Sequence, residues 1–217
     1  GSYDAFVPNS INHNWRWQSQ EVNAMLARAQ KTMGELNAFS QFAPNVEMYI
    51  HLLVKQEAVV SSKIEGTQTR IEEALMREGE IVPERRDDWQ EVQNYTAALN
   101  YCVDTLADLP VSNRMIRAAH EILLHGVRGH GKAPGEYRKT QNWIGGATIA
   151  DAVFVPPSAD QVPDLMHDIE LFLHNEAIYV PALIRAAIMH YQFETIHPFL
   201  DGKGRIGRLL ITVYLIE

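Results

Sequence analysis

HPFLDGKGRIGR, the stretch from residue 197 to residue 208, decides how this chain is interpreted. It combines a histidine, a carboxylate, a glycine-rich turn and two arginines in one short segment. Gly202 and Gly204 leave backbone N–H groups uncovered where a helix is expected to begin, and a helix N-terminus is a ready site for anions. The stretch therefore predicts a site for a phosphate-bearing ligand.

The side chains of this stretch suit the same kind of ligand. Arg205 and Arg208 are three residues apart, so on a helix they share one face and can present planar guanidinium groups to phosphate oxygens. Asp201 offers hard oxygen ligands of the kind that hold Mg²⁺ beside phosphates. His197 titrates near neutral pH and could take a proton from an attacking hydroxyl.

Residues 202–207 also match the G-x-G-x-x-G fingerprint of dinucleotide-binding proteins. That fingerprint needs a hydrophobic strand before it and an acidic residue about 20 positions after it. Residues 181–196 instead carry apolar side chains at helical spacing, and the sequence ends at Glu217, before such an acid. The context decides against a dinucleotide-binding unit.

Two further histidines, His120 and His125, raise the question of a zinc protease. They are five residues apart, one more than H-E-x-x-H requires, and this step turns the second imidazole by about 140° around a helix. We therefore expect both to be packed or solvated helix residues rather than zinc ligands.

Composition sets the broad class of the protein. Lys and Arg total 19 against 27 for Asp and Glu, a net charge of -8, which argues against direct binding of nucleic acid or anionic membrane while leaving a local basic pocket open. The single cysteine, Cys102, excludes an intrachain disulfide. Without a signal-like start or an apolar stretch of about 20 residues, we expect a soluble, cytoplasmic protein with one principal domain.

Apolar residues recur at steps of three and four over most of the chain and predict an all-α fold. Ser19 and Asn45 are placed to cap the first two helices. The exception is the Gly- and Pro-containing segment 126–157, where β-prone pieces at 137–144 and 152–155 flank Gly145-Gly146. This pattern predicts a small hairpin in a long connection.

At this point the stretch 197–208 resembles the signature of the Fic family, H-P-F-x-[D/E]-G-N-G-R-x-x-R. It matches at every specified position except Lys203, where the family usually has Asn. Residues 61–66, SSKIEG, also resemble the family's inhibitory motif, [S/T]-x-x-x-E-[G/N], placed upstream as in the class with an N-terminal inhibitory helix. The resemblance extends from about residue 45 to residue 217 and implies an all-α, Fic-type helical bundle with a small β-hairpin flap.

The resemblance also implies a division of the chain. Residues 1–40 would be an N-terminal helical extension and residues 41–217 the Fic domain, with the inhibitory helix at about 46–66 and the flap at about 137–155. Members of this type often carry a C-terminal winged-helix module, which these residues do not include. Because residues 209–217 form an apolar helix without a cap, we expect the natural chain to continue.

The activity that the resemblance implies is transfer of AMP from Mg²⁺-bound ATP to a Ser, Thr or Tyr hydroxyl of a protein. His197 would be the base and Asp201 the Mg²⁺ ligand. Self-modification and a homodimer are left open. The phosphates would contact Gly202, Lys203, Gly204, Arg205 and Arg208. The target would pair with the flap at Ile144, Gly145, Gly146 and Ala147, or at residues 152–154.

The inhibitory motif adds a control step. A Glu65 carboxylate reaching Arg208 would occupy the guanidinium that should receive the γ-phosphate, with Ser61 and Gly66 completing the motif. Three alternatives stay open. The chain could remove AMP, it could use another nucleotide, or, because Lys203 replaces the usual Asn, it could be a degenerate Fic domain that only binds a nucleotide or partner.

Overall fold

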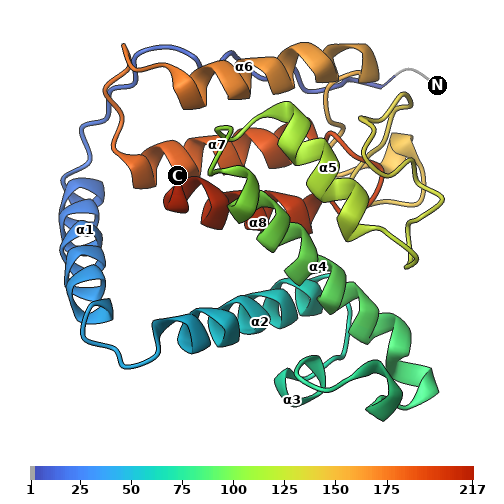
Figure 1. The fold of residues 1–217 in the computed structure, drawn as a ribbon. Helices are drawn as coiled ribbons and strands as arrows, with labels where there is room; N and C mark the ends of the chain where they lie inside the picture. The colour runs from blue at the N-terminus through green and yellow to red at the C-terminus, as the bar shows by residue number, and fades with distance from the viewer. Residues whose placement is uncertain (1–2) are drawn as a thin grey trace.

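The computed structural model describes residues 3–217, and over those residues the fold is all-α, as the sequence predicted (Figure 1). Short 3-10 turns lie at Glu78–Glu80, Pro83–Arg85, Ile149–Asp151 and Ala159–Gln161. The α-helices are α1 (Gln20–Ser40), α2 (Val46–Ile64), α3 (Ile71–Ala74), α4 (Arg86–Thr105), α5 (Asn113–Leu123), α6 (Val162–His174), α7 (Ala182–Ile196) and α8 (Lys203–Ile216).

Side-chain caps fix the starts of the first two helices where the sequence predicted them. The Ser19 hydroxyl accepts a hydrogen bond from the backbone N–H of Val22 at 3.2 Å. The Asn45 side chain accepts one from the N–H of Met48, also at 3.2 Å. Each cap satisfies a donor that the helix itself cannot pair, which is typically worth about 1 kcal/mol.

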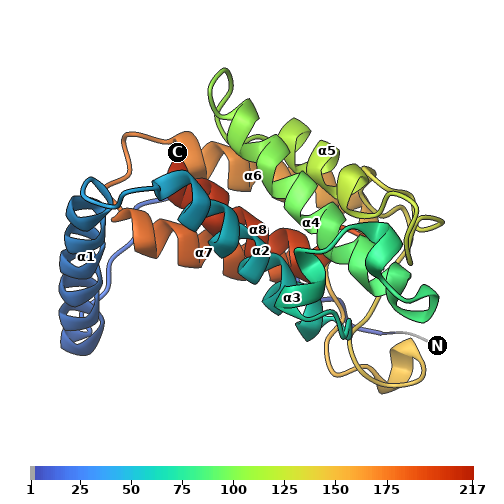
Figure 2. The same cartoon turned by 60° about the horizontal axis from the view of Figure 1, so that its bottom comes forward.

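The hydrophobic core lies around α8, which packs against α7, α4, α5 and α2. Figures 1 and 2 both show α7 and α8 side by side, and Figure 1 shows α4 running diagonally across α8. Phe199 from the decisive stretch is fully buried, together with Tyr95, Phe172 and Phe193. Burying a large apolar side chain of this kind contributes roughly 1.5–3 kcal/mol, so Phe199 anchors the loop between α7 and α8 in the core.

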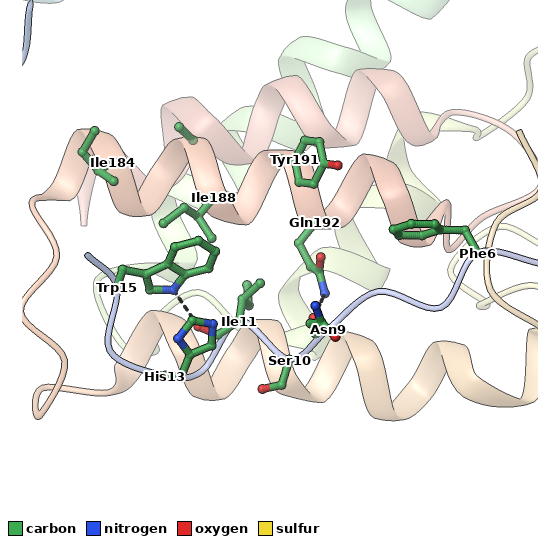
Figure 3. Close-up of a pocket in the computed structure, with 11 residues that line it drawn as sticks. Phe6, Asn9, Ser10, Ile11, His13, Trp15, Ile184, Ile188, Tyr191 and Gln192 are labelled. Atoms are coloured by element: carbon green, nitrogen blue, oxygen red, sulfur yellow. Dashed lines mark hydrogen bonds between the residues drawn. The ribbon is translucent and has the colours of Figure 1, made fainter. Parts of the chain in front are cut away.

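Residues 3–18 form an extended segment, here called the strap, that runs along α6 and α7. The Asp168 carboxylate of α6 accepts hydrogen bonds from the Ser10 hydroxyl at 2.5 Å and the Ile11 N–H at 2.7 Å. Gln192 of α7 donates to the carbonyl of Asn9 at 3.0 Å. Figure 3 shows an open, largely apolar pocket of about 610 Å³ between the strap and α7. No residue predicted for the site lines it.

The prediction of a regular β-hairpin in the flap, residues 137–155, is wrong. The structure has one isolated antiparallel bridge, between Ile144 and Phe154, and no pair of strands in this part of the described chain. Gly145 and Gly146 have φ values of 71° and 74°, a conformation outside the strand region. The side chain of Gln141 donates to the carbonyls of Asn142 and Pro156. Side-chain hydrogen bonds thus replace a backbone ladder here.

The last two features are the exposure of α1 and the length and apolarity of the helices. α1 has no buried residue and extends away from the bundle in both views (Figures 1 and 2). Within residues 3–217, no helix combines the length and the apolarity that crossing a bilayer requires.

Candidate active site

His197 lies at the turn between α7 and α8 in an unusual backbone conformation. Its φ and ψ are 54° and 57°, the left-handed region that non-glycine residues rarely adopt. Its N–H still donates to the carbonyl of Phe193 at 3.0 Å, which closes α7. Such strain persists only where the surroundings over-determine it, and it is common at functional sites. Gly202, also left-handed with a φ of 67°, then starts α8.

The imidazole of His197 is set up to accept a proton. Nδ1 lies 3.2 Å from the carbonyl oxygen of Glu194, so Nδ1 carries the hydrogen and Nε2 keeps its lone pair. Burial of the ring, followed by the nearby ammonium of Lys203, lowers the pKa of His197 to about 4. The ring is therefore neutral at pH 7.

Asp201 sits at the end of the same loop, beside the first turn of α8. Its Oδ1 accepts the N–H of Gly202 at 2.6 Å. A Cβ added to Gly129 would lie 2.8 Å from Oδ2, and Gly129 has a φ of 88°, so only glycine leaves this carboxylate its space. The backbone carbonyl of Asp201 lies 2.9 Å from Nε2 of His120.

The predicted inhibitory motif meets Arg208 directly. Nη2 of Arg208 lies 2.7 Å from Oε1 of Glu65, and Nε donates to the Ser61 hydroxyl at 2.8 Å. Nη2 also donates to the Ser61 carbonyl at 2.9 Å. Gly66, with a φ of 103°, follows Glu65 at the end of α2. A Cβ at Gly204 would collide with the Glu65 carboxylate, so this acid lies over the first turn of α8.

Arg205, predicted to face phosphate beside Arg208, is instead held inside the protein. It is 3% exposed, and its Nη1 donates to Glu91 of α4 at 3.0 Å. Glu91 is itself buried and also accepts from Nε of Arg128 at 2.7 Å. The two arginines of the stretch are thus paired with carboxylates from different helices, and only Arg208 lies near the predicted inhibitory glutamate.

The remaining predicted residues divide into two groups. Lys203 and Gly204 form the partly exposed first turn of α8, where backbone N–H groups lack helical partners. Gly145, Gly146 and Ala147 are exposed and Ile144 is 39% exposed, in the irregular flap. The first group follows the His197 loop directly. In the second group, the backbone N–H of Ile144 donates to the carbonyl of Phe154, and its carbonyl accepts from the N–H groups of Val153 and Phe154.

Two related family descriptions match this chain. Fic/DOC family N-terminal matches residues 23–104, and Fic/DOC family matches residues 110–215. The chain belongs to the Fic family. Together the two matches extend from within α1 to within α8 and include every residue of the site described above.

Curated relatives of this Fic chain are named protein adenylyltransferases. A probable protein adenylyltransferase of Aquifex aeolicus is 30% identical over 172 residues, which is 79% of this chain and 51% of that protein. The protein adenylyltransferase Fic of Culex quinquefasciatus is 30% identical over 177 residues, 79% of this chain and 33% of that protein. The Fic chain therefore spans between about a third and half of these relatives.

Solved structures agree on the Fic fold. A Fic family protein from Desulfovibrio desulfuricans superposes with a TM-score of 0.73 at 27% identity, covering 94% of this chain and 59% of that one. Fic-1 from Caenorhabditis elegans gives a TM-score of 0.71 at 22% identity, covering 90% of this chain and 57% of that one.

Sequence reasoning missed two polar residues that hold the Fic motif in place. His120 is fully buried, stacks on Phe199 with ring centroids 3.8 Å apart, and accepts the N–H of Gly135 at Nδ1 at 2.9 Å. The sequence left open whether His120 is packed or solvated, and it did not predict the bond to Asp201. Glu91, the partner of Arg205, carried no sequence signal because 114 positions separate the two residues.

Proposed function

We propose that this chain is the core of a self-inhibited protein adenylyltransferase, which moves AMP from ATP to a Ser, Thr or Tyr hydroxyl of a protein. The observation that carries this proposal is the 2.7 Å ion pair between Glu65 and Arg208, beside a neutral His197. The names of the curated relatives support the same reaction class.

The chemistry would proceed as one displacement at phosphorus. Nε2 of His197 would take the proton of the target hydroxyl while its oxygen attacks the α-phosphorus of ATP. The bond between the α-phosphorus and the bridging oxygen breaks, and pyrophosphate leaves with that electron pair. A neutral imidazole is required for the first step, and burial favours that state.

Mg²⁺ fits the Asp201 carboxylate. Oδ1 is occupied by the N–H of Gly202, whereas Oδ2 keeps its lone pairs beside the space that Gly129 leaves free. Residues 3–217 contain no group of three or more acidic, His or Cys side chains that could hold a metal, which suits an ion held by one or two carboxylates, water and substrate phosphates. When bound there, Mg²⁺ would neutralise charge on the phosphates.

The phosphates would lie at the start of α8. The N–H groups of Lys203 and Gly204, in the first turn of α8, and the helix dipole favour an anion there, and the Lys203 ammonium adds a point charge. Nη2 of Arg208 donates to Glu65 and to the Ser61 carbonyl, so an outer phosphate would compete with these two acceptors for the guanidinium. Arg205 would support the site from within, through its bond to Glu91.

The inhibitory role of Glu65 follows from competition and repulsion. Its carboxylate uses the Arg208 guanidinium and places a negative charge over Gly204, where the polyphosphate would lie. Repulsion between the Glu65 carboxylate and the phosphates would disfavour ATP binding. ATP would therefore bind weakly or unproductively in the resting protein.

The proposal is tested by intact-mass analysis of the parent, Glu65→Gly and Glu65→Gly/His197→Ala proteins after incubation with Mg²⁺ and ATP, with self-modification as the readout. We expect a gain of one or more AMP units in Glu65→Gly alone. No gain in Glu65→Gly, while calorimetry shows that it binds ATP, would reject the transferase and favour a nucleotide-binding module.

Lys203 favours that second candidate, a Fic domain that binds nucleotide without transferring it. Its ammonium lowers the pKa of His197 and lacks the acceptor that the usual Asn supplies. If Lys203→Asn creates transfer in the Glu65→Gly background where the parent residue gives none, the binding module is the better description of the natural protein.

A further inference from the structure

The guanidinium of Arg138, in the first part of the flap, reaches the catalytic loop. Arg138 is 2% exposed. Its Nε donates to the carbonyl of His197 at 2.9 Å, and its Nη2 donates to the carbonyl of Ile196 at 3.2 Å. Its backbone N–H donates to the carbonyl of Pro198 at 2.8 Å. One residue therefore holds three consecutive carbonyls around His197.

The same guanidinium also holds both ends of the flap. Nη1 donates to the carbonyl of Thr140 at 3.3 Å, and Nη2 donates to the carbonyl of Pro157 at 2.5 Å. Thr140 precedes the Ile144–Phe154 bridge and Pro157 follows it. Asn142 adds a second connection, because its Nδ2 lies 3.4 Å from the carbonyls of both His197 and Phe199.

The charge of Arg138 has no acidic partner. No carboxylate of residues 3–217 lies within ion-pair distance of it, so carbonyl dipoles alone stabilise the buried cation. Two of them end α7, where the helix dipole favours positive charge. A buried cation is costly unless its hydrogen bonds are well made, so moving the flap or the catalytic loop away from Arg138 is unfavourable.

We propose that Arg138 is a positioning residue that couples the flap to the His197 loop, so that a target bound to the flap is aligned with the catalytic imidazole. The effect on transfer rests on the proposed function, whereas the coupling between the flap and the His197 loop does not. The planar guanidinium suits this task because its donors point in several fixed directions. A lysine ammonium would keep the charge but could not reach all four backbone carbonyls that the guanidinium contacts.

Arg185 provides a matched control within the same chain. It is 7% exposed, has no acidic partner in the described part of the chain, and donates to the carbonyls of Leu173 and Ile178 near the end of α6. It lies twelve residues before His197 on α7, about 18 Å along the helix axis. Arg185→Lys should therefore cost similar stability without touching the flap or His197.

The first test is hydrogen–deuterium exchange followed by mass spectrometry, which needs no activity. Arg138→Lys should speed exchange about tenfold in both 140–157 and 193–203, whereas Arg185→Lys should speed it only around 172–180. Asn142→Ala, a milder change, should affect the same two segments less strongly and serves if Arg138→Lys does not fold. Faster exchange in only one of the two segments, or in neither, would overturn the coupling.

The second test measures transfer in the Glu65→Gly background. Because a displacement of about 1 Å can cost a hundredfold in rate, Arg138→Lys should lower kcat by about 10- to 100-fold, with less than a twofold change in the Kd for ATP. Arg185→Lys with an equal fall in Tm should keep kcat within twofold. Equal losses of kcat in Arg138→Lys and Arg185→Lys would show that Arg138 has only a structural role. A Glu65→Gly protein that transfers nothing would reject the proposed function while the exchange result still decides the coupling.

Discussion

His120 is a buried polar residue that holds the loop from His197 to Asp201 in place. One ring nitrogen contacts the carbonyl of Asp201, the other accepts the N–H of Gly135, and the ring face covers Phe199. The first contact requires a hydrogen on Nε2 and the second requires a lone pair on Nδ1, so only one neutral tautomer satisfies both. Burial lowers the pKa of His120 to about 4, which keeps the ring in that neutral state.

Replacing His120 tests this arrangement. His120→Ala should lower the free energy of unfolding by about 3 kcal/mol, because it leaves a cavity against Phe199 and unpairs a buried N–H and a buried carbonyl. His125→Ala, at the exposed end of the same helical segment, should change it by less than about 0.5 kcal/mol. Urea titration of both variants gives the comparison, and similar losses would contradict the role assigned to His120.

At the scale of elements, the proposed inhibition depends on the contact between the end of α2 and α8. Two acceptors of Ser61 and one of Glu65 hold the Arg208 guanidinium. The hydroxyl of Ser62, next along α2, is buried and has no hydrogen-bond partner. The two serines are therefore a natural pair for separating the role of the Arg208 contact from that of general packing.

Ser61→Ala removes the bond to Nε of Arg208 but leaves Glu65 in place. A hydrogen bond to a charged group is worth about 1.5–3 kcal/mol, so the inhibitory contact should weaken without being lost. AMP incorporation should fall between that of the parent and that of Glu65→Gly, whereas Ser62→Ala should behave like the parent. Incorporation by Ser61→Ala equal to the parent's would show that this hydroxyl does not support inhibition.

The sequence was most informative about individual secondary-structure elements. Apolar spacing and the caps at Ser19 and Asn45 predicted the helices because these signals are local. The regular hairpin was mispredicted, because backbone pairing in the flap is limited to the bridge between Ile144 and Phe154. Arg138 and Gln141 instead donate to the carbonyls of Thr140, Pro156 and Pro157. Ion pairs such as Glu91 and Arg205 form between positions that are far apart in the sequence. The spacing of residues along one sequence does not reveal them.

The whole molecule should lose stability in mild acid. His120 and His197 both have a pKa of about 4 in the folded state, against 6.5 for the ordinary side chain. Between these values the unfolded chain binds more protons, so the free energy of unfolding rises with pH there. The stabilisation is complete above pH 6.5 and is lost as pH falls towards 4, by on the order of 3 kcal/mol for each residue.

Thermal unfolding between pH 4 and pH 7 in magnesium-free buffer checks this expectation. Glu194 acts in the opposite sense, because burial raises its pKa and its contribution is lost as pH rises through that value, but one such group should not cancel two histidines. His197→Ala should flatten the acid side of the profile relative to the parent. A parent Tm that is constant across this range would contradict the buried, neutral state of both rings.

The strap adds a contact to the flap from outside the residues that the two family descriptions match. Residues 3–18 precede the first position that either family description matches, yet the N–H of Phe6 bonds to the carbonyl of Val155 at 2.9 Å and its ring packs on Phe154. A segment outside the shared family pattern thus touches the edge of the flap. Substitutions in the strap can therefore change the surroundings of the flap while the sequence from His197 to Arg208 stays the same.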